Sequence, residues 1–214
     1  MQIGVVVSLA VFSYLLGSVP TAFLVAKAHG IDIRTVGSGN VGATNVFRAL
    51  GKWWGLLTFF SDLMKGFIPG MVFPLIAGRW LGYDGKATYL GLVCAALAIA
   101  GHNWPIYLHF KGGKGVATSA GALMGVAPIA GAIGLGAWLL VFLPTRYVSL
   151  ASIVAALAIS ISAWILYLDK GPVLPGVLTV LAGILIIRHH ANIGRLLSGT
   201  ENRIEFRKKT SVRT

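Results

Sequence analysis

Three short polar segments, 37–45, 109–115 and 189–195, hold most of the residues that could do chemistry. They combine hydroxyl, amide, imidazole, ammonium and guanidinium groups with many glycines, whereas the sequence between them is almost wholly apolar. Because hydrocarbon has no water to solvate backbone amides, such segments must lie at a membrane face or line a polar cavity. Cationic side chains beside glycine amides that no Cβ shields are typical of sites for phosphate and other anions.

The first segment can hold an anion through its backbone. Gly37, Gly39 and Gly42 allow tight turns that present amides, and Arg48 follows with a guanidinium that can bind phosphate through two parallel hydrogen bonds. Its neutral side-chain donors are Ser38, Asn40, Thr44 and Asn45. A polar turn between two membrane spans explains the same spacing equally well. The Gly-x4-Gly-Lys-Ser/Thr sequence of a Walker A loop is absent.

The second segment places two lysines around a pair of glycines. Lys111 and Lys114 flank Gly112 and Gly113, and a helix predicted to begin near Val116 would direct its positive N-terminal end at the same place. A phosphate is the natural occupant of such a site. The alternative is a juxtamembrane lysine pair that contacts lipid headgroups.

The third segment carries a histidine and an asparagine that share a helical face. His189, Asn192 and Arg195 are spaced i, i+3 and i+6, which places the first two on one side of a helix. A histidine there can act as a base or position a hydroxyl group. A histidine that only contacts lipid headgroups is the alternative.

Other polar residues fall within or beside apolar stretches. Asp62 and Lys65 share a helix face at or near membrane depth, where ionisable groups are costly and functional by default, although a structural clamp explains them as well. His102 and His109 are expected to be structural or interfacial. The single cysteine, Cys94, excludes a disulfide framework and is expected to be a structural thiol. No cluster with metal-ligand spacing is visible, so we expect neither a metal nor a cofactor.

The composition indicates an integral membrane protein. Of 214 residues, 56% are hydrophobic, above the share of about 45–50% in soluble domains. Lys and Arg outnumber Asp and Glu by 18 to 6, which favours the positive-inside bias of cytoplasmic loops over nucleic-acid binding. An anionic ligand explains the basic residues inside the glycine-rich segments. We expect one all-α, membrane-embedded domain, 1–214.

The apolar runs predict the helices that position the polar segments. The expected spans are 3–26, 53–78, 89–100, 116–143, 148–168 and 173–187. The first lacks a basic leader region and is expected to be a retained span rather than a cleaved signal, kinked near 17–20. Glycines 121, 125, 131, 134 and 136 suit close helix packing.

Charge sets the expected orientation. Most of the Lys and Arg residues lie in the loop 27–52, the loop 101–115 and the tail after Arg188, so all three regions should face the cytoplasm. Six simple spans would put the third region on the opposite side, so one apolar run must break or fail to cross. Pro69, Pro74 and Pro128 are candidate break points, and 173–187 is short for a full crossing. We therefore expect five or seven spans, with the N-terminus outside and the C-terminus in the cytoplasm.

Together the three segments resemble those of the acyl-phosphate:glycerol-3-phosphate acyltransferase (PlsY) family of bacterial membranes. The resemblance lies in residues 37–48, 101–118 and 188–201, with Asp62, Lys65-Gly66 and 146–152 in support. It covers the whole chain in the right order. One departure is Val41, where the family often has proline, and we expect a softer loop without lost chemistry.

The resemblance implies a seven-span helix bundle with broken or half helices in the bacterial cytoplasmic (inner) membrane, with the active site facing the cytoplasm. It implies transfer of a fatty acyl group from acyl phosphate to the 1-hydroxyl of sn-glycerol 3-phosphate, forming lysophosphatidic acid and phosphate in phospholipid synthesis. Membrane lipids and the enzyme that makes acyl phosphate are candidate partners. The His-x4-Asp signature of other glycerolipid acyltransferases is absent, so acyl-CoA and acyl carrier protein are not expected donors.

An acyl phosphate is already activated, so direct attack by the glycerol hydroxyl is favoured, with the protein positioning reactants and stabilising charge. The residues expected to be catalytic are Ser38, Lys114, His189 and Asn192. Those expected to bind substrate are Gly39, Asn40, Gly42, Ala43, Thr44, Asn45, Arg48, Lys111, Gly112, Gly113 and Ser149. In the alternative, Ser38 is an acylated nucleophile with His189 as its base, which is weaker because no carboxylate is evident to orient the histidine.

Two other classes of function fit parts of the pattern. An organic-phosphate transporter would also hold an anion at amide-rich turns, but no clear inverted repeat is visible and the motifs gather on one predicted face. A scaffold without activity would leave the basic glycine loops without a purpose.

Overall fold

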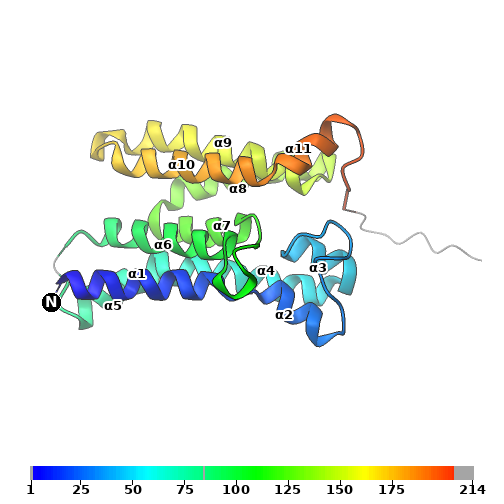
Figure 1. The fold of residues 1–214 in the computed structure, drawn as a ribbon. Helices are drawn as coiled ribbons and strands as arrows, with labels where there is room; N and C mark the ends of the chain where they lie inside the picture. The colour runs from blue at the N-terminus through cyan, green and yellow to red at the C-terminus, as the bar shows by residue number, and fades with distance from the viewer. Residues whose placement is uncertain (1, 84, 205–214) are drawn as a thin grey trace, which may run out of the picture.

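The computed structural model describes residues 2–83 and 85–204, which contain helices and no strand (Figure 1). The longer helices are α1 (Gln2–Ser18), α4 (Lys52–Phe67), α6 (Ala87–Asn103), α7 (Val116–Val126), α8 (Pro128–Thr145), α9 (Val148–Tyr167) and α10 (Val173–Arg188). The shorter ones are α2 (Thr21–Ala28), α3 (Ala43–Leu50), α5 (Phe73–Trp80), α11 (His190–Leu197) and the single turns η1 (Ile68–Val72), η2 (Ile106–Leu108) and η3 (Leu168–Lys170). The expected all-α class is confirmed.

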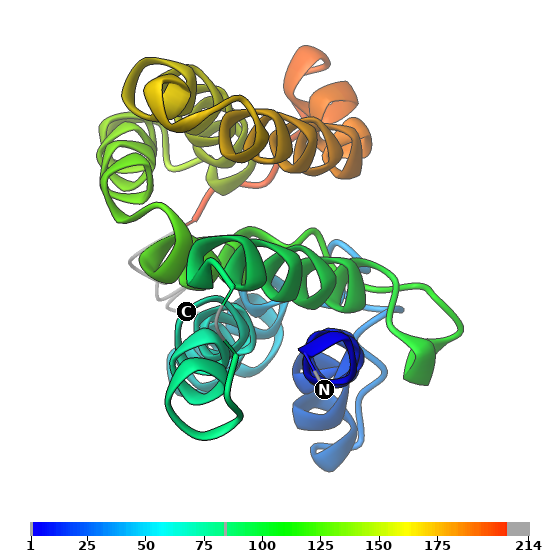
Figure 2. The same ribbon diagram turned by 90° about the vertical axis from the view of Figure 1, so that its left-hand side faces the viewer.

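The helices form two layers, α1 to α7 in one and α8 to α11 in the other (Figures 1 and 2). Within the layers α1 packs on α6, α4 on α7, and α9 on both α8 and α10. An apolar core cluster joins the layers, with Leu92 of α6 and Leu123 of α7 on one side and Ala163 of α9 and Leu178 of α10 on the other. The seam between the layers is therefore apolar.

The long apolar run 116–143 is two helices, with the break at one of the three candidate prolines. Helix α7 ends at Val126, and α8 begins at Pro128. Ala127 between them has φ −151° and ψ 67°, because a residue before proline is forced out of the helical region. Pro69 and Pro74 do not separate helices; the chain passes them in the π turn η1 and the first turn of α5.

The first apolar run is also divided. The kink expected near 17–20 is a break between α1 and α2, and Pro20 precedes the second helix. A lysine from another helix compensates for the break, since Lys65 Nζ donates a hydrogen bond of 2.6 Å to the Val19 carbonyl.

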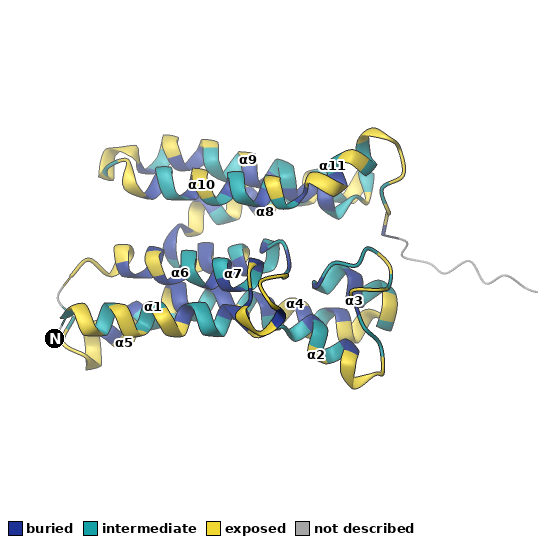
Figure 3. Cartoon of the chain, viewed as in Figure 1, coloured by how far each residue is buried: buried dark blue, intermediate teal, exposed yellow. Residues whose placement is uncertain are grey.

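Five helical regions are long and apolar enough to cross a membrane: Gln2–Ala28, Lys52–Trp80, Ala87–Leu108, Pro128–Thr145 and Val148–Lys170. Helices α10 and α11 together are also long and apolar enough, but the chain bends by 57° at the break between them. Helix α7 is apolar but shorter than these regions. Large apolar side chains are exposed on the outer faces, as typical of lipid-facing helices; Leu140 is 78% and Ile165 77% exposed (Figure 3). The chain is a multi-pass membrane protein. The expected total of seven spans would require α7 and α10 to cross the membrane as well. This number stays a prediction.

Glycines bring α7 into close contact with α4 and η1. A Cβ at Gly121 would overlap the Leu63 carbonyl, and one at Gly125 would lie 2.7 Å from the Gly70 carbonyl. The expected close packing is confirmed at these two positions and wrong at Gly136, where a Cβ would meet nothing within 4 Å. A Cβ at Gly66 of α4 would overlap the Thr118 carbonyl, so the start of α7, which follows the second polar segment, is also packed against α4.

Candidate active site

The three polar segments meet at the end of the molecule that carries α3 and α11 (Figure 1). The first touches the second, because a Cβ on Gly113 would come within 2.8 Å of the Val41 carbonyl. The second bonds to the third, where Lys114 Nζ donates to Asn192 Oδ1. The residues that follow the first and third segments also meet, where Arg48 Nη2 donates to the Asn202 carbonyl at 3.1 Å. The second segment therefore contacts both others, and the first and third are linked through the residues that follow them.

Asn45 holds the first segment in shape. Its Oδ1 accepts from the Ser38 N–H at 3.0 Å, and its Nδ2 donates to the carbonyls of Ile33 at 3.1 Å and Val36 at 3.0 Å. Gly37 has φ +58°, and a Cβ there would collide with Asn45 Oδ1. The buried amide expected to bind substrate is thus occupied by the loop itself, and it positions Ser38.

The backbone of this segment leaves donors at the first turn of α3. The Gly42 N–H bonds to the Asn40 carbonyl at 3.1 Å, and the Asn45 N–H bonds to the Gly42 carbonyl at 3.0 Å. The amides of Ala43 and Thr44 lie in the first turn, where N–H groups have no intrahelical acceptor. Of the amides expected around 42–45, these two are the ones that can face an anion. The backbone of Gly39 adopts φ +66° in the turn before them.

The second segment separates its two lysines. Lys111 is exposed, whereas Lys114 is half-buried and bonded to Asn192. The Gly113 N–H donates to the His102 carbonyl at 3.0 Å. A Cβ on Gly112 would overlap that carbonyl, and a Cβ on Gly113 would overlap the His102 ring. Both glycines are therefore required by the close packing of the loop on the end of α6.

His189 lies at the 57° bend between α10 and α11 and is 2% exposed. Its Nδ1 is 2.8 Å from the Leu185 carbonyl. Because a carbonyl oxygen can only accept, Nδ1 carries a proton. Burial lowers the pKa of His189 to about 4, so the ring is neutral at pH 7 and keeps its lone pair on Nε2. The histidine is thus oriented by a backbone carbonyl, a partner that the sequence does not reveal.

Glu201 is a candidate site residue that sequence reasoning had not placed in the site. Its Oε1 accepts from Ser149 Oγ at 2.9 Å and Asn192 Nδ2 at 2.7 Å, and its Oε2 from Arg195 Nε at 2.7 Å. The side chain is 5% exposed. One feature of the sequence could have indicated this role, because Glu201 is the single carboxylate within 188–201. This carboxylate joins α9 to α11 and orients the asparagine that receives Lys114.

The electrostatics of the cluster favour an anionic ligand. Burial lowers the pKa of Lys114 from 10.5 to about 8, and the nearby Glu201 carboxylate offsets part of this effect. Burial alone would raise the pKa of Glu201, but hydrogen bonds from Asn192, Arg195 and Ser149 outweigh it and hold the pKa below its usual value. Burial also lowers the pKa of Arg48, again opposed by Glu201. One carboxylate thus faces three cationic side chains.

Asp62 and Lys65 lie behind the second segment as a buried pair. Lys65 Nζ is 2.6 Å from Asp62 Oδ1, and His102 Nδ1 is 3.7 Å from the same oxygen. Lys65 also binds the Val19 carbonyl. Of the two alternatives for this pair, a functional role and a structural clamp, these contacts favour the clamp.

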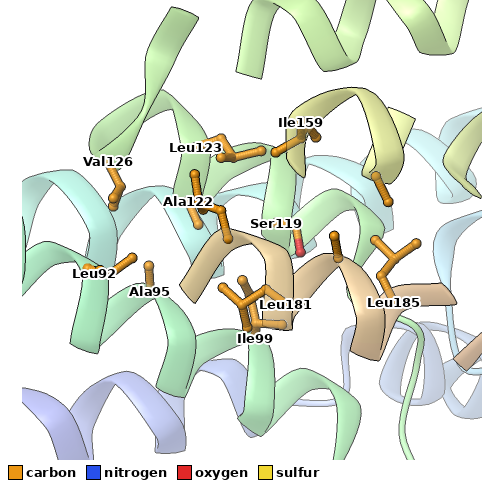
Figure 4. A pocket seen from close by; sticks show the side chains of 13 residues that line it. Leu92, Ala95, Ile99, Ser119, Ala122, Leu123, Val126, Ile159, Leu181 and Leu185 are labelled. Carbon is orange, nitrogen blue, oxygen red and sulfur yellow. The ribbon is translucent and has the colours of Figure 1, made fainter. Parts of the chain in front are cut away.

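A narrow apolar cavity of about 40 Å³ lies in the seam between the layers (Figure 4). It is lined by side chains of α6, α7, α9 and α10, among them Ile99, Ala122 and Ile159. Two of its lining residues are close in sequence to the polar cluster: Ser119 lies in the first turn of α7, five residues after Lys114, and Leu185 supplies the carbonyl that holds His189.

Across residues 2–83 and 85–204, no three His, Cys, Asp or Glu side chains are grouped so that they could hold a metal ion.

Comparison with known proteins identifies a single family. The model of the glycerol-3-phosphate acyltransferase family matches residues 7–199. The chain is 48% identical to the glycerol-3-phosphate acyltransferase of Aquifex aeolicus, covering 91% of this chain and 97% of the relative. It is 43% identical to that of Clostridioides difficile, covering 98% and 100%.

Solved structures agree with this. The crystal structure of PlsY (YgiH), an integral membrane glycerol 3-phosphate acyltransferase, in its glycerol 3-phosphate form matches with a TM-score of 0.80 at 42% identity, covering 94% of this chain and 96% of that one. Its lysophosphatidic acid form matches with a TM-score of 0.78 at 40% identity, covering 94% and 95%.

Proposed function

The chain belongs to the glycerol-3-phosphate acyltransferase family, and we propose that it transfers a fatty acyl group from acyl phosphate directly to the 1-hydroxyl of sn-glycerol 3-phosphate. The observation that carries this proposal is the bonded chain from Lys114 through Asn192 to Glu201, with Arg48 and Arg195 beside it. A donor and an acceptor that both carry phosphate match such an excess of positive charge.

In the proposed reaction the glycerol 1-hydroxyl oxygen forms a bond to the acyl carbon, the bond from that carbon to the phosphate oxygen breaks, and the hydroxyl proton passes to the departing phosphate. Arg48 and Lys114 neutralise the phosphate groups, and the Nε2 lone pair of His189 accepts the hydrogen bond of the attacking hydroxyl. The charge on the carbonyl oxygen is stabilised by Ser38 and the first-turn amides of α3.

Direct transfer is preferred over an acylated Ser38. An acyl phosphate is an activated anhydride, so no covalent intermediate is needed to lower the barrier. A serine nucleophile and its base require a hydrogen bond between them. Within the described residues no such bond joins Ser38 to His189.

The fatty chain is proposed to lie in the seam that contains the apolar cavity. The cavity of about 40 Å³ is far smaller than a fatty chain, so the chain would widen the seam between α7 and α10 and extend into the bilayer. The adjoining Ser119 and Leu185 would bring its carboxyl end toward Lys114 and His189.

We place the protein in the bacterial cytoplasmic membrane with the site facing the cytoplasm, because the basic segments gather at one end of the bundle. Single cysteines added at each terminus and labelled in intact cells test this orientation. Opposite sidedness of the two termini is expected, and labelling from the same side would contradict it.

The proposed activity is tested by phosphate release from palmitoyl phosphate with the purified full chain in detergent, where a transporter has no gradient to act on. Release should depend on glycerol 3-phosphate and be matched by lysophosphatidic acid, with palmitoyl-CoA inactive as donor. Turnover with palmitoyl-CoA instead would overturn the donor assignment. An acylated Ser38 peptide after mixing with donor alone would overturn direct transfer.

A further inference from the structure

Arg188, the last residue of α10, reaches across the seam to the second polar segment. Its Nη2 donates to the carbonyls of Gly112 at 2.8 Å and Gly113 at 2.7 Å, and its Nε donates to the Gly113 carbonyl at 3.1 Å. Its guanidinium also lies over the Trp104 ring, 5.8 Å from the ring centre. The half-buried guanidinium is therefore directed at two backbone oxygens of the loop.

The orientation of these carbonyls matters to any anion held by the loop. A glycine-rich loop attracts an anion with its N–H groups, whereas a carbonyl turned toward the same place repels it. The N–H and C=O of one peptide group point in opposite directions, so holding the Gly113 carbonyl turns the Lys114 N–H away from Arg188. Glycine permits the opposite orientation of such a peptide with little steric cost. The Arg188 guanidinium thus prevents the peptide group between Gly113 and Lys114 from flipping.

The same contact sets a distance between two parts of the site. Arg188 immediately precedes His189, which is in turn held by the Leu185 carbonyl. From the opposite side, the His102 carbonyl accepts the Gly113 N–H at 3.0 Å. The loop is therefore fixed between the end of α6 and the end of α10, and the position of Lys114 relative to His189 follows from this.

We propose that Arg188 is a positioning residue: by holding the Gly112 and Gly113 carbonyls it keeps the Lys114 N–H turned toward the bound anion, and it ties the phosphate loop to the helix end carrying His189. This inference rests on the proposed function for its kinetic readout. Its structural readout, the exchange of the loop amides, does not.

The experiment compares Arg188→Gln and Arg188→Lys in the full-length protein. Arg79→Gln and Arg79→Lys serve as controls, because Arg79 lies 5.7 Å from the Trp80 ring at the other end of the bundle and so resembles Arg188 in its aromatic contact only. KM for glycerol 3-phosphate, the inhibition constant of inorganic phosphate, kcat and melting temperature are measured for each.

Loss of positioning should raise KM and the phosphate inhibition constant of Arg188→Gln by about tenfold or more. Lysine should restore part of the loss, because it keeps the charge but cannot donate in a fork to two carbonyls. A residue that only supports folding would lower the melting temperature and kcat while leaving KM unchanged, and this outcome overturns the proposal.

Hydrogen–deuterium exchange of the peptide covering 104–115 gives the second measurement. Faster exchange in both Arg188 variants, and slower exchange in the wild type with inorganic phosphate, are expected. A raised KM with unchanged exchange would mean that Arg188 contacts substrate instead of holding the loop, and would overturn the proposal. If the wild type turns over no acyl phosphate, the proposed function fails, while the exchange comparison still decides the role of Arg188.

Discussion

The first and second polar segments are both glycine-rich turns at the same end of the molecule, but they are held in different ways. The first is organised by its own residue Asn45, which bonds to backbone groups 7 to 12 positions away. The second is held by Arg188, 75 and 76 positions away, and by the end of α6. A turn that carries its own support can be inferred from nearby sequence, whereas one held by distant groups depends on the packing of whole helices.

The largest effect is expected where the second segment meets the third. Lys114→Met removes the half-buried cation bonded to Asn192 while keeping most of its volume, so kcat/KM should fall by about 10² to 10³. Lys111→Met, in the same segment but exposed, should cost less. Steady-state kinetics with both substrates provide the test. Equal losses in the two variants would contradict the distinction that burial draws between these lysines.

A somewhat smaller effect is expected from breaking the local support of the first segment. Asn45→Ala removes three hydrogen bonds and leaves buried backbone groups unpaired, which should cost about 2–4 kcal/mol in the stability of this loop. Amide exchange should quicken at 31–46 and stay unchanged at 104–115. Asn45→Asp, which keeps the acceptor of the Ser38 N–H, is the matched variant. Exchange that rises equally in both loops would show that they are not supported independently.

Arg48 follows the first segment and bonds to the Asn202 carbonyl, which follows the third, and its loss is expected to affect binding. Arg48→Ala should cost about 2–3 kcal/mol of glycerol 3-phosphate binding through the lost charge-assisted contact. Arg48→Lys should also fall short, since lysine cannot donate two parallel hydrogen bonds. The KM values for glycerol 3-phosphate provide the measurement, and unchanged kinetics would remove Arg48 from the site.

The smallest effect is a pH dependence that belongs to the second segment. Burial lowers the pKa of Lys114 to about 8, so the ammonium is charged below this pH and neutral above it. Activity should therefore decline as pH rises through about 8, with about one lysine in ten still charged one unit higher. Lys114→Arg should keep its charge and extend activity to higher pH. If the activity of Lys114→Arg declined at the same pH as that of the wild type, the decline would belong to the titration of another group.

The helical class and most helix positions could be predicted because apolar runs of span length have few alternatives in a membrane. The runs 89–100 and 148–168 correspond to α6 (Ala87–Asn103) and α9 (Val148–Tyr167). Which proline breaks a run was harder to predict. Pro128 separates α7 from α8, whereas Pro69 is accommodated by a π turn, a difference that depends on the packing around each proline.

The candidate site was predictable in its residue types but not in their tasks. Lys114, Asn192 and Ser149 do come together, through a carboxylate that sequence reasoning had not placed in the site. Asn45 has the polar side chain expected of a ligand donor but uses it on its own loop. A side chain's type limits which bonds it can form, and only its neighbours in space decide which of them are formed.

The sequence by itself determined that the chain is a helical membrane protein with three basic, glycine-rich turns, because apolar length and glycine conformational freedom are local properties. Its motifs were also sufficient to indicate the family. Only the tertiary structure decided that Glu201 joins Ser149, Asn192 and Arg195, and that Arg188 holds the carbonyls of the second turn. The contact of Ser149 with Glu201 and those of Arg188 with the second turn join residues 52 to 76 positions apart, and the packing of the helices sets the distances between them.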